Sequence, residues 1–361
     1  MLKQTALHSR HQALGARLVD FAGWEMPVQY KSSLDEHHAV RRACGMFDVS
    51  HMQVVDLAGA RTAEFLRRLL ANDVAKLTTP GRALYTCMLK PAGGVIDDLI
   101  VTRRDGDAFR IVVNAGTADK DIAWMREQAA AFGVSVAQRS DLGILAVQGP
   151  QARETVARHL PAAFAERALA LKPFHAAWQD EWYVSRTGYT GEDGFELVLP
   201  HARILALWDA LIGEAVVPCG LGARDSLRLE AGMNLYGNDM DETVSPLECA
   251  LGWTVAWEPE DRNFIGRPAL EKQRHERARV MRAVVLEGRG VLRAHMPVRD
   301  AAKRLVGALC SGGFSPTMKA SIGFARIDAH AGAPLEVEIR GQWLSLRLVK
   351  PPFVRHGQVL V

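Results

Sequence analysis

Two adjacent carboxylates, Asp97 and Asp98, stand in the segment GGVIDDLIVT and are the first candidates for chemistry. The apolar residues around them predict a strand from Val95 to Val101, and successive side chains of a strand face opposite ways. We therefore expect one carboxylate to point inward and the other outward, so that the two do not form a catalytic dyad. A carboxylate among apolar side chains is poorly solvated, and such groups are often functional. The pattern leaves open an alternative, an aspartate that accepts hydrogen bonds from turn amides.

A third acid, Glu196, follows the glycine-rich segment 188–194, GYTGEDG. Its GxxGxxG spacing and the strand-like FELVL after it differ from a dinucleotide loop, in which GxGxxG opens a helix. We expect a hairpin with Asp193-Gly194 at the turn. On the strand, Glu196 shares a face with Gly194 and Val198, which places its carboxylate beside an apolar floor. Such a carboxylate can accept two parallel N–H bonds from a heterocycle edge such as that of a pterin or guanine.

Neither metal ligation nor a disulfide framework is indicated. The cysteines are odd in number, widely spaced and without a CxxC pair, which favours a reducing compartment. The run DMDE at 239–242 resembles part of a calcium loop but lacks the rest of that pattern. We therefore expect no metal site. We assign the aromatic residues Trp24, Tyr30 and Trp253 to the core or to an interface.

The composition indicates an ordinary globular protein of two or three domains, with 361 residues of which 48% are hydrophobic and 24% charged. The 44 Lys and Arg against 41 Asp and Glu leave a formal charge of +3, which does not indicate a nucleic-acid binder. No segment approaches the ~18 apolar residues of a membrane span. The N-terminus, MLKQTALHSRHQALG, has no apolar run typical of a secretory signal. We expect a cytoplasmic protein that works without nucleic acid or membrane.

The elements that must position these acids are readable in outline. A helix is predicted from Leu34 to Ala43, and two strands, 83–89 and 95–101, pair through a turn at Pro91–Gly94. From residue 280 onward, short β-like runs are separated by Gly and Pro. This spacing predicts a separate antiparallel β domain, a barrel or a sandwich.

Several long strings point to one family when they are taken in order. They are VDFAGWEMPVQY, GMFDVSHM, GGVIDDLIV, FRIVVNA, LAVQGPQA, SRTGYTGEDGFEL, GLGARDSLRLEAG, LYGNDMDE and GFSPTMKASI. Their order and wording closely resemble the aminomethyltransferase family, the T-proteins of the glycine cleavage system. The resemblance extends from about Thr5 to Arg355. One departure is Lys319 in FSPTMKAS, where the family usually has glycine, which affects the local loop shape.

The resemblance implies an α+β fold with three domains around a central folate cavity and a C-terminal antiparallel β-barrel-like domain. Residues 1–52 and 141–250 would form a discontinuous first, folate-binding domain. Residues 53–140 would form a second α+β domain, and 251–361 a linker and the barrel.

The resemblance also implies an activity. The family transfers the one-carbon unit of the aminomethyl group on lipoylated H-protein to tetrahydrofolate, giving methylenetetrahydrofolate, ammonia and dihydrolipoyl H-protein. Tetrahydrofolate would be a co-substrate, lipoylated H-protein the partner, and no metal would be needed. A folate domain of a dimethylglycine- or sarcosine-oxidising enzyme would carry an added flavin domain, which this chain does not show. The remaining alternative is a folate-binding accessory protein of iron–sulfur assembly, but that group has KGCYxGQE where this chain reads RTGYTGED.

Residue by residue, the resemblance assigns Asp98 as the catalytic carboxylate, with Asp97 as the alternative. Glu196 matches the carboxylate that holds the pterin edge, and Arg224 of GARD matches a folate-contacting arginine. The positions near the cavity match Asn114, Tyr85, Met52 and Tyr236. The C-terminal tail of the family supplies a further folate contact, for which Arg355 is the basic residue here, although the aligned place is Val359.

Overall fold

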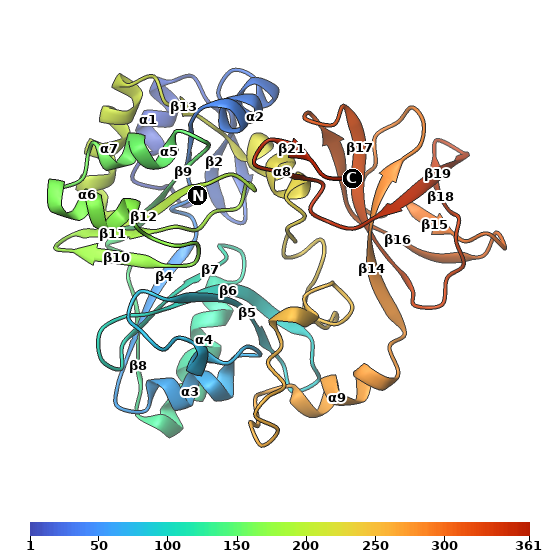
Figure 1. Ribbon diagram of the computed structural model, residues 1–361, viewed down its shortest axis with the longest axis horizontal. Helices are drawn as coiled ribbons and strands as arrows, with labels where there is room; N and C mark the ends of the chain where they lie inside the picture. Colours follow the sequence, from blue (N-terminus) through green and yellow to red (C-terminus); the bar gives the residue numbers. More distant parts are fainter.

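The computed structural model describes residues 1–361 and contains three bodies, each built on its own sheet (Figure 1). The first body holds a six-stranded sheet in the order β10-β11-β12-β9-β3-β13, in which only β13 and β3 run parallel. Its strands are β3 (Gly45–Asp48), β9 (Leu142–Gln148), β10 (Ala176–Gln179), β11 (Trp182–Ser185), β12 (Gly194–Pro200) and β13 (Val217–Pro218). A hairpin of β1 (Arg17–Phe21) and β2 (Trp24–Gln29) lies beside it.

Helices cover both faces of this first sheet. They are α1 (His8–Ala13), α2 (Ser33–Arg42), α5 (Ala152–Ala157), α6 (Ala162–Leu169), α7 (His201–Gly213) and α8 (Leu221–Glu230). Alternate residues of β12 divide between the two faces, as a strand requires. Phe195 packs with α5, α6 and α7, whereas Val198 packs with α2 and α8. Glu196 has the parity of Val198, so it lies on the α8 side.

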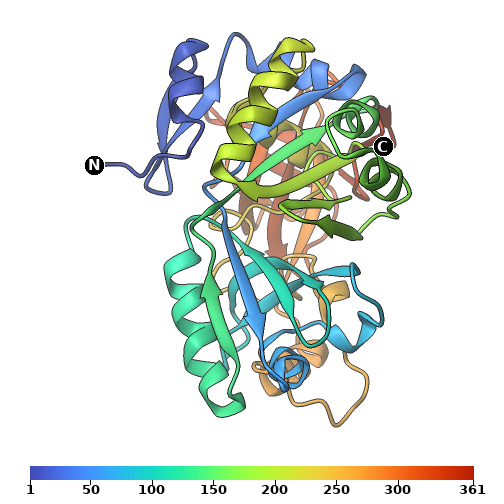
Figure 2. The same ribbon diagram turned by 90° about the vertical axis from the view of Figure 1, so that its left-hand side faces the viewer.

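The second body is a five-stranded antiparallel sheet in the order β5-β6-β7-β4-β8, and it lies below the first body in both views (Figures 1 and 2). Its strands are β4 (Gln53–Ala58), β5 (Ala83–Leu89), β6 (Val95–Arg103), β7 (Phe109–Val113) and β8 (Ser135–Gln138). One face is covered by α3 (Thr62–Leu69) and α4 (Ala118–Ala129), which the short turns η1 (Val74–Lys76) and η2 (Ala130–Phe132) accompany. The paired runs predicted at 83–89 and 95–101 form the β5–β6 hairpin.

The third body is a closed antiparallel barrel in the order β14-β17-β16-β15-β18-β19. Its strands are β14 (Arg279–Leu286), β15 (Pro297–Arg299), β16 (Leu305–Ser315), β17 (Ala320–Asp328), β18 (Leu335–Ile339) and β19 (Gln342–Val349). Buried apolar side chains fill its interior. A short ribbon of β20 (Val354–Arg355) and β21 (Gln358–Val359) follows. The expected C-terminal β domain is therefore a barrel, not a sandwich.

The segment after α8 runs between the three bodies and includes η3 (Gly252–Thr254) and α9 (Arg267–His275) (Figure 1). A core of 20 buried residues collects there from all three bodies, with Cys87 from β5, Leu229 from α8 and Phe324 from β17 among them. Burying one such side chain contributes about 1.5–3 kcal/mol, so this shared core holds the bodies together. We propose that the bodies are the three domains, divided as the sequence analysis expects.

The start of β6 is tied to this central segment. The backbone N–H of Val95 donates to the carbonyl oxygens of Asp241 at 3.1 Å and Val244 at 3.0 Å. A Cβ at Gly94 would overlap the carbonyl oxygen of Glu242. Only glycine allows this close approach, which fixes the strand that carries Asp97 and Asp98.

None of the helices combines the length and the apolar composition that a membrane span requires.

We expect Gly94→Ala to destabilise the protein by about 2 kcal/mol or more, because the added methyl group must push the hairpin away from the central segment. Thermal unfolding followed by circular dichroism measures the loss. Gly213→Ala is the matched control, since a Cβ there meets nothing within 4 Å. Equal melting temperatures for the two variants would contradict the packing described here.

Candidate active site

Asp98 lies on β6, on the side of the sheet away from α3 and α4. The hydroxyl of Tyr85 donates to its Oδ2 at 2.7 Å, and the side-chain amide of Asn114 donates to its Oδ1 at 3.0 Å. Tyr85 pairs with Ile100 in the β5–β6 ladder, so its side chain and that of Asp98 share one face. Asp98 is half-buried and keeps some access to solvent.

Asp97 leaves the strand on the other side and is fully buried. Its Oδ2 accepts the backbone N–H of Asn114 at 3.0 Å, and its Oδ1 accepts the side-chain amide of the same residue at 2.9 Å. Asn114, just after β7, therefore donates to both neighbouring carboxylates. The strand alternation separates the two acids by face, but this amide connects them.

The electrostatics of Asp98 follow from this placement. Burial raises the pKa of Asp98 to about 7, and the negative charge of Asp97 acts in the same direction. The hydrogen bonds from Tyr85 and Asn114 lower that pKa but do not cancel the rise. A carboxyl group with a pKa near 7 can both hold and release a proton at neutral pH.

Glu196 and Arg224 belong to the first body. The hydroxyl of Thr187 donates to Oε2 of Glu196 at 2.5 Å. The guanidinium carbon of Arg224, on α8, lies 4.6 Å from the centre of the Tyr189 ring, and its Nη2 lies 3.9 Å from Sδ of Met52. Burial lowers the pKa of Arg224, and the negative charge of Glu196 opposes that change. Both side chains are half-buried.

Tyr189 and Tyr85 connect the residues around Asp98 with the residues around Glu196 and Arg224. Burial is the main cause that raises the pKa of Tyr189, and the charge of Asp98 adds to it, so a residue of the first body lies close to an acid of the second. The pKa of Tyr85, raised mainly by burial, is also affected by Tyr189. The second body thus supplies Asp98, Tyr85 and Asn114 to the candidate site. Glu196 and Arg224 belong to the first body, and Met52 lies beside Arg224.

Tyr189 stands in the glycine-rich loop, and no sequence pattern singles it out for this role. Trp253 is predicted to lie in the core or at an interface. The indole is 68% exposed, so the core assignment is wrong, and it stacks on Tyr85 with ring centres 5.8 Å apart. Its position in η3, in the segment between the apolar residues Leu251 and Val255, gives no signal of this exposure.

Two predicted residues lie further out. The hydroxyl of Tyr236 accepts a hydrogen bond from Lys120 at 2.8 Å and donates to the carbonyl of Val95 at 3.1 Å, so it braces the start of β6. Arg355 is exposed in β20, and its side chain makes no hydrogen bond or ion pair in the structure. The tail beyond it is held on the glycine-rich loop, where the N–H of Gly357 donates to Glu192 at 2.8 Å. Contact of Arg355 with a ligand stays a prediction.

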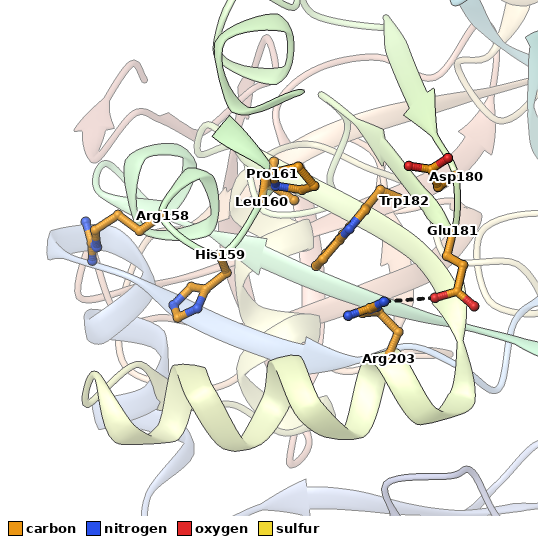
Figure 3. A pocket seen from close by; sticks show the side chains of 8 residues that line it. All are labelled: Arg158, His159, Leu160, Pro161, Asp180, Glu181, Trp182 and Arg203. Carbon is orange, nitrogen blue, oxygen red and sulfur yellow. Dashed lines mark hydrogen bonds and ion pairs between the residues drawn. The ribbon is translucent and has the colours of Figure 1, made fainter. Parts of the chain in front are cut away.

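The pocket drawn in Figure 3 is a different feature. It has a volume of about 390 Å³ and lies in the first body beside α7, where Arg203 pairs with Glu181 at 2.9 Å. None of the predicted site residues lines it. The central folate cavity therefore stays a prediction that this pocket does not represent. The structure contains no group of three or more His, Cys, Asp or Glu placed to hold a metal ion.

Comparison with known proteins decides the family. The profile of the GCVT N-terminal domain matches residues 7–259, and that of the glycine cleavage T-protein C-terminal barrel domain matches 279–355. The chain belongs to the glycine cleavage T-protein family. It is 53% identical over 358 residues to the aminomethyltransferase of Methylococcus capsulatus (strain ATCC 33009 / NCIMB 11132 / Bath), covering 99% of this chain and 98% of that protein.

A solved T-protein agrees with the fold. The crystal structure of glycine cleavage system aminomethyltransferase T from Bartonella henselae superposes with a TM-score of 0.92 at 34% identity, covering 99% of both chains. The expected α+β fold with a C-terminal barrel is confirmed. As a T-protein, the chain is an enzyme of the aminomethyltransferase class.

We expect Asp98→Asn to be more stable than the wild type at pH 8, by a few degrees in melting temperature. The pKa of Asp98 is higher in the folded chain than its ordinary value of 3.8, so the folded state binds the proton more tightly and loses stability as pH rises from about 4 to 7. Melting temperatures at pH 4, 6 and 8 measure this, with the exposed Asp107→Asn as the control. If the difference in melting temperature between Asp98→Asn and the wild type does not grow with pH, the pKa of Asp98 is not raised in the folded chain.

Proposed function

We propose that this T-protein transfers the one-carbon unit of the aminomethyl group on lipoylated H-protein to tetrahydrofolate. The observation that carries the proposal is that two acids from different bodies are linked through Tyr189. The charge of Asp98 acts on its phenol, and the guanidinium carbon of Arg224, on which the charge of Glu196 acts, lies 4.6 Å from the centre of its ring. Glu196 is suited to bind a ligand, and Asp98 is suited to transfer a proton.

The folate side is proposed at Glu196. A reduced pterin presents parallel N–H donors along one edge, and a carboxylate can accept two of them. The hydrogen bond from Thr187 fixes the orientation of this carboxylate before the ligand arrives. Arg224, held against Tyr189 and Met52, offers a cation to the anionic part of folate, and the two neighbours offer apolar surface to its rings.

The reacting side is proposed at Asp98. In the overall reaction the methylene carbon leaves its sulfur and its nitrogen and bonds to two nitrogens of tetrahydrofolate, whose two protons pass to the sulfur and to ammonia. Positive charge develops on the carbon–nitrogen unit as ammonia departs. An ionised carboxylate held by Tyr85 and Asn114 stabilises that charge without reorganisation. Because the pKa of Asp98 is about 7, the same group can carry one of the protons.

We expect Asp98→Asn to release ammonia at least about a hundredfold more slowly than the wild type, because the amide carries neither the charge nor the proton. The assay combines purified protein, H-protein loaded with the aminomethyl group, and tetrahydrofolate. Tetrahydrofolate affinity, measured by calorimetry, should stay within a fewfold of wild type. Normal turnover would rule out the proposed role, and Asp107→Asn controls for a surface charge change.

Glu196→Ala should act differently and chiefly weaken tetrahydrofolate binding. Loss of a charged, two-pronged acceptor costs about 1.5–3 kcal/mol, or about 10- to 100-fold in affinity. Calorimetry gives the affinity, and turnover at saturating folate should recover most of the wild-type rate. Glu166→Ala, an exposed acid on α6 without an ion pair, is the control. Unchanged affinity would count against the pterin assignment.

A further inference from the structure

A third carboxyl group lies behind the pair on β6. Asp121 is in the first turn of α4 and has no exposed surface. Neither of its oxygens receives a hydrogen bond from a donor. Its carboxyl group instead shares a hydrogen bond with that of Asp97, and this is possible only if one of the two acids holds a proton.

The available donors decide which acid holds it. Both oxygens of Asp97 already accept hydrogen bonds from Asn114. The hydroxyl of Thr117 also lies near both carboxyl groups, but it has a single proton and donates it to the carbonyl of Asn114 at 3.1 Å. Lys120 is paired with Glu242 at 2.8 Å. A buried carboxylate without a donor is costly, so the proton belongs on Asp121. Burial and the charge of Asp97 accordingly raise the pKa of Asp121 to about 10.

The ordinary explanation for an acid in this place does not fit Asp121. Carboxylates in the first turn of a helix are favoured because they are ionised near its positive end or accept its free N–H groups. Asp119, in the same turn, is exposed and fits that role. Asp121 faces the sheet and accepts no N–H group, so the helix dipole does not account for it.

We propose that Asp121 is a positioning residue for the reaction: as a neutral carboxylic acid it donates a hydrogen bond to Asp97 and keeps Asp97 ionised beside Asp98. The relevance to catalysis rests on the proposed function of Asp98. Because Asn114 holds both β6 carboxylates, the charge of Asp97 is fixed next to Asp98 and opposes its ionisation.

The surroundings add little competing charge. The other titratable groups that face the three carboxyls are Tyr85 and Cys87 on β5, Tyr189 in the glycine-rich loop, Lys120 on α4, and Tyr236 and Cys249 in the central segment. Burial raises the pKa of every phenol and thiol among them, so these groups are neutral near pH 7. Lys120 is the one cation, and it is neutralised by Glu242.

The test is a titration of the side-chain carboxyl groups by ¹³C NMR on the full chain, with the signals assigned by single Asp→Asn variants. In the wild type, Asp121 should remain protonated and Asp97 ionised from pH 5 to 8, while Asp98 titrates within that range. Ionisation of Asp121 below pH 7 would overturn the proposal without any variant of that residue.

Two variants of Asp121 separate its donor from its shape. Asp121→Asn keeps an N–H donor to Asp97, so the midpoint of Asp98 should stay within about half a pH unit of wild type. Asp121→Leu removes the donor, so the proton moves onto Asp97 and the midpoint of Asp98 should fall by about one unit or more. The pH–rate profile of transfer should shift with it. Equal midpoints for the two variants would overturn the proposal.

The outcome also separates this inference from the proposed function. A wild type that shows the expected titration but transfers no aminomethyl group would contradict the function and leave the protonation of Asp121 standing. If the wild type transfers the aminomethyl group normally but the titration midpoint of Asp98 is unchanged in Asp121→Leu, only the inference is contradicted.

Discussion

The proposed active site depends on the hydrogen bonds of the side-chain amide of Asn114. Its nitrogen donates to a carboxylate oxygen of Asp97 and to one of Asp98, two acids that the strand directs to opposite faces of the sheet. Without this bridge, Asp97 would be a buried acid of the core and Asp98 an acid on the far side. With it, the charge of one sets the ionisation of the other. The β6 strand therefore directs the two carboxyl groups to opposite faces of the sheet. The amide of Asn114 holds both of them, and the charge of Asp97 raises the pKa of Asp98.

This coupling works against folding. An acid whose pKa is raised by burial destabilises the folded chain at neutral pH, and Asp98 is such an acid. The structure offsets the cost elsewhere, because the start of β6 is anchored to the central segment through Val95, and Tyr236 braces the same point. A strained or poorly solvated active site supported by a rigid surround is a frequent arrangement in enzymes. The close approach at Gly94 belongs to this support.

Local patterns in the sequence were sufficient for several elements and insufficient for the contacts between them. The alternation in GGVIDDLIVT gave the strand and the opposite orientations of its two acids, and the spacing after residue 280 gave an antiparallel β domain but not its closure. Asn114 was found only through family resemblance, because its pairing depends on the β6–β7 register. Asp121 looked like an ordinary acid in a helix turn. Tyr189 and Trp253 acquire their places from contacts with other bodies or across the central segment, which no short window of sequence contains.

The shared core explains why the residues from the first body and those from the second body keep fixed relative positions in the proposed site. Glu196 and Asp98 are on different sheets, and neither sheet alone fixes the distance between them. The central segment packs against α8, which carries Arg224, against the β5–β6 hairpin, which carries Tyr85 and Asp98, and against β17 of the barrel. α8 is also bound to the barrel, since Arg228 donates to Ser311 at 3.0 Å and Ser315 donates to Glu230 at 2.5 Å. The barrel thus contributes to the site without supplying Asp98 or Glu196: it holds the helix and the segment that set the positions of both sides.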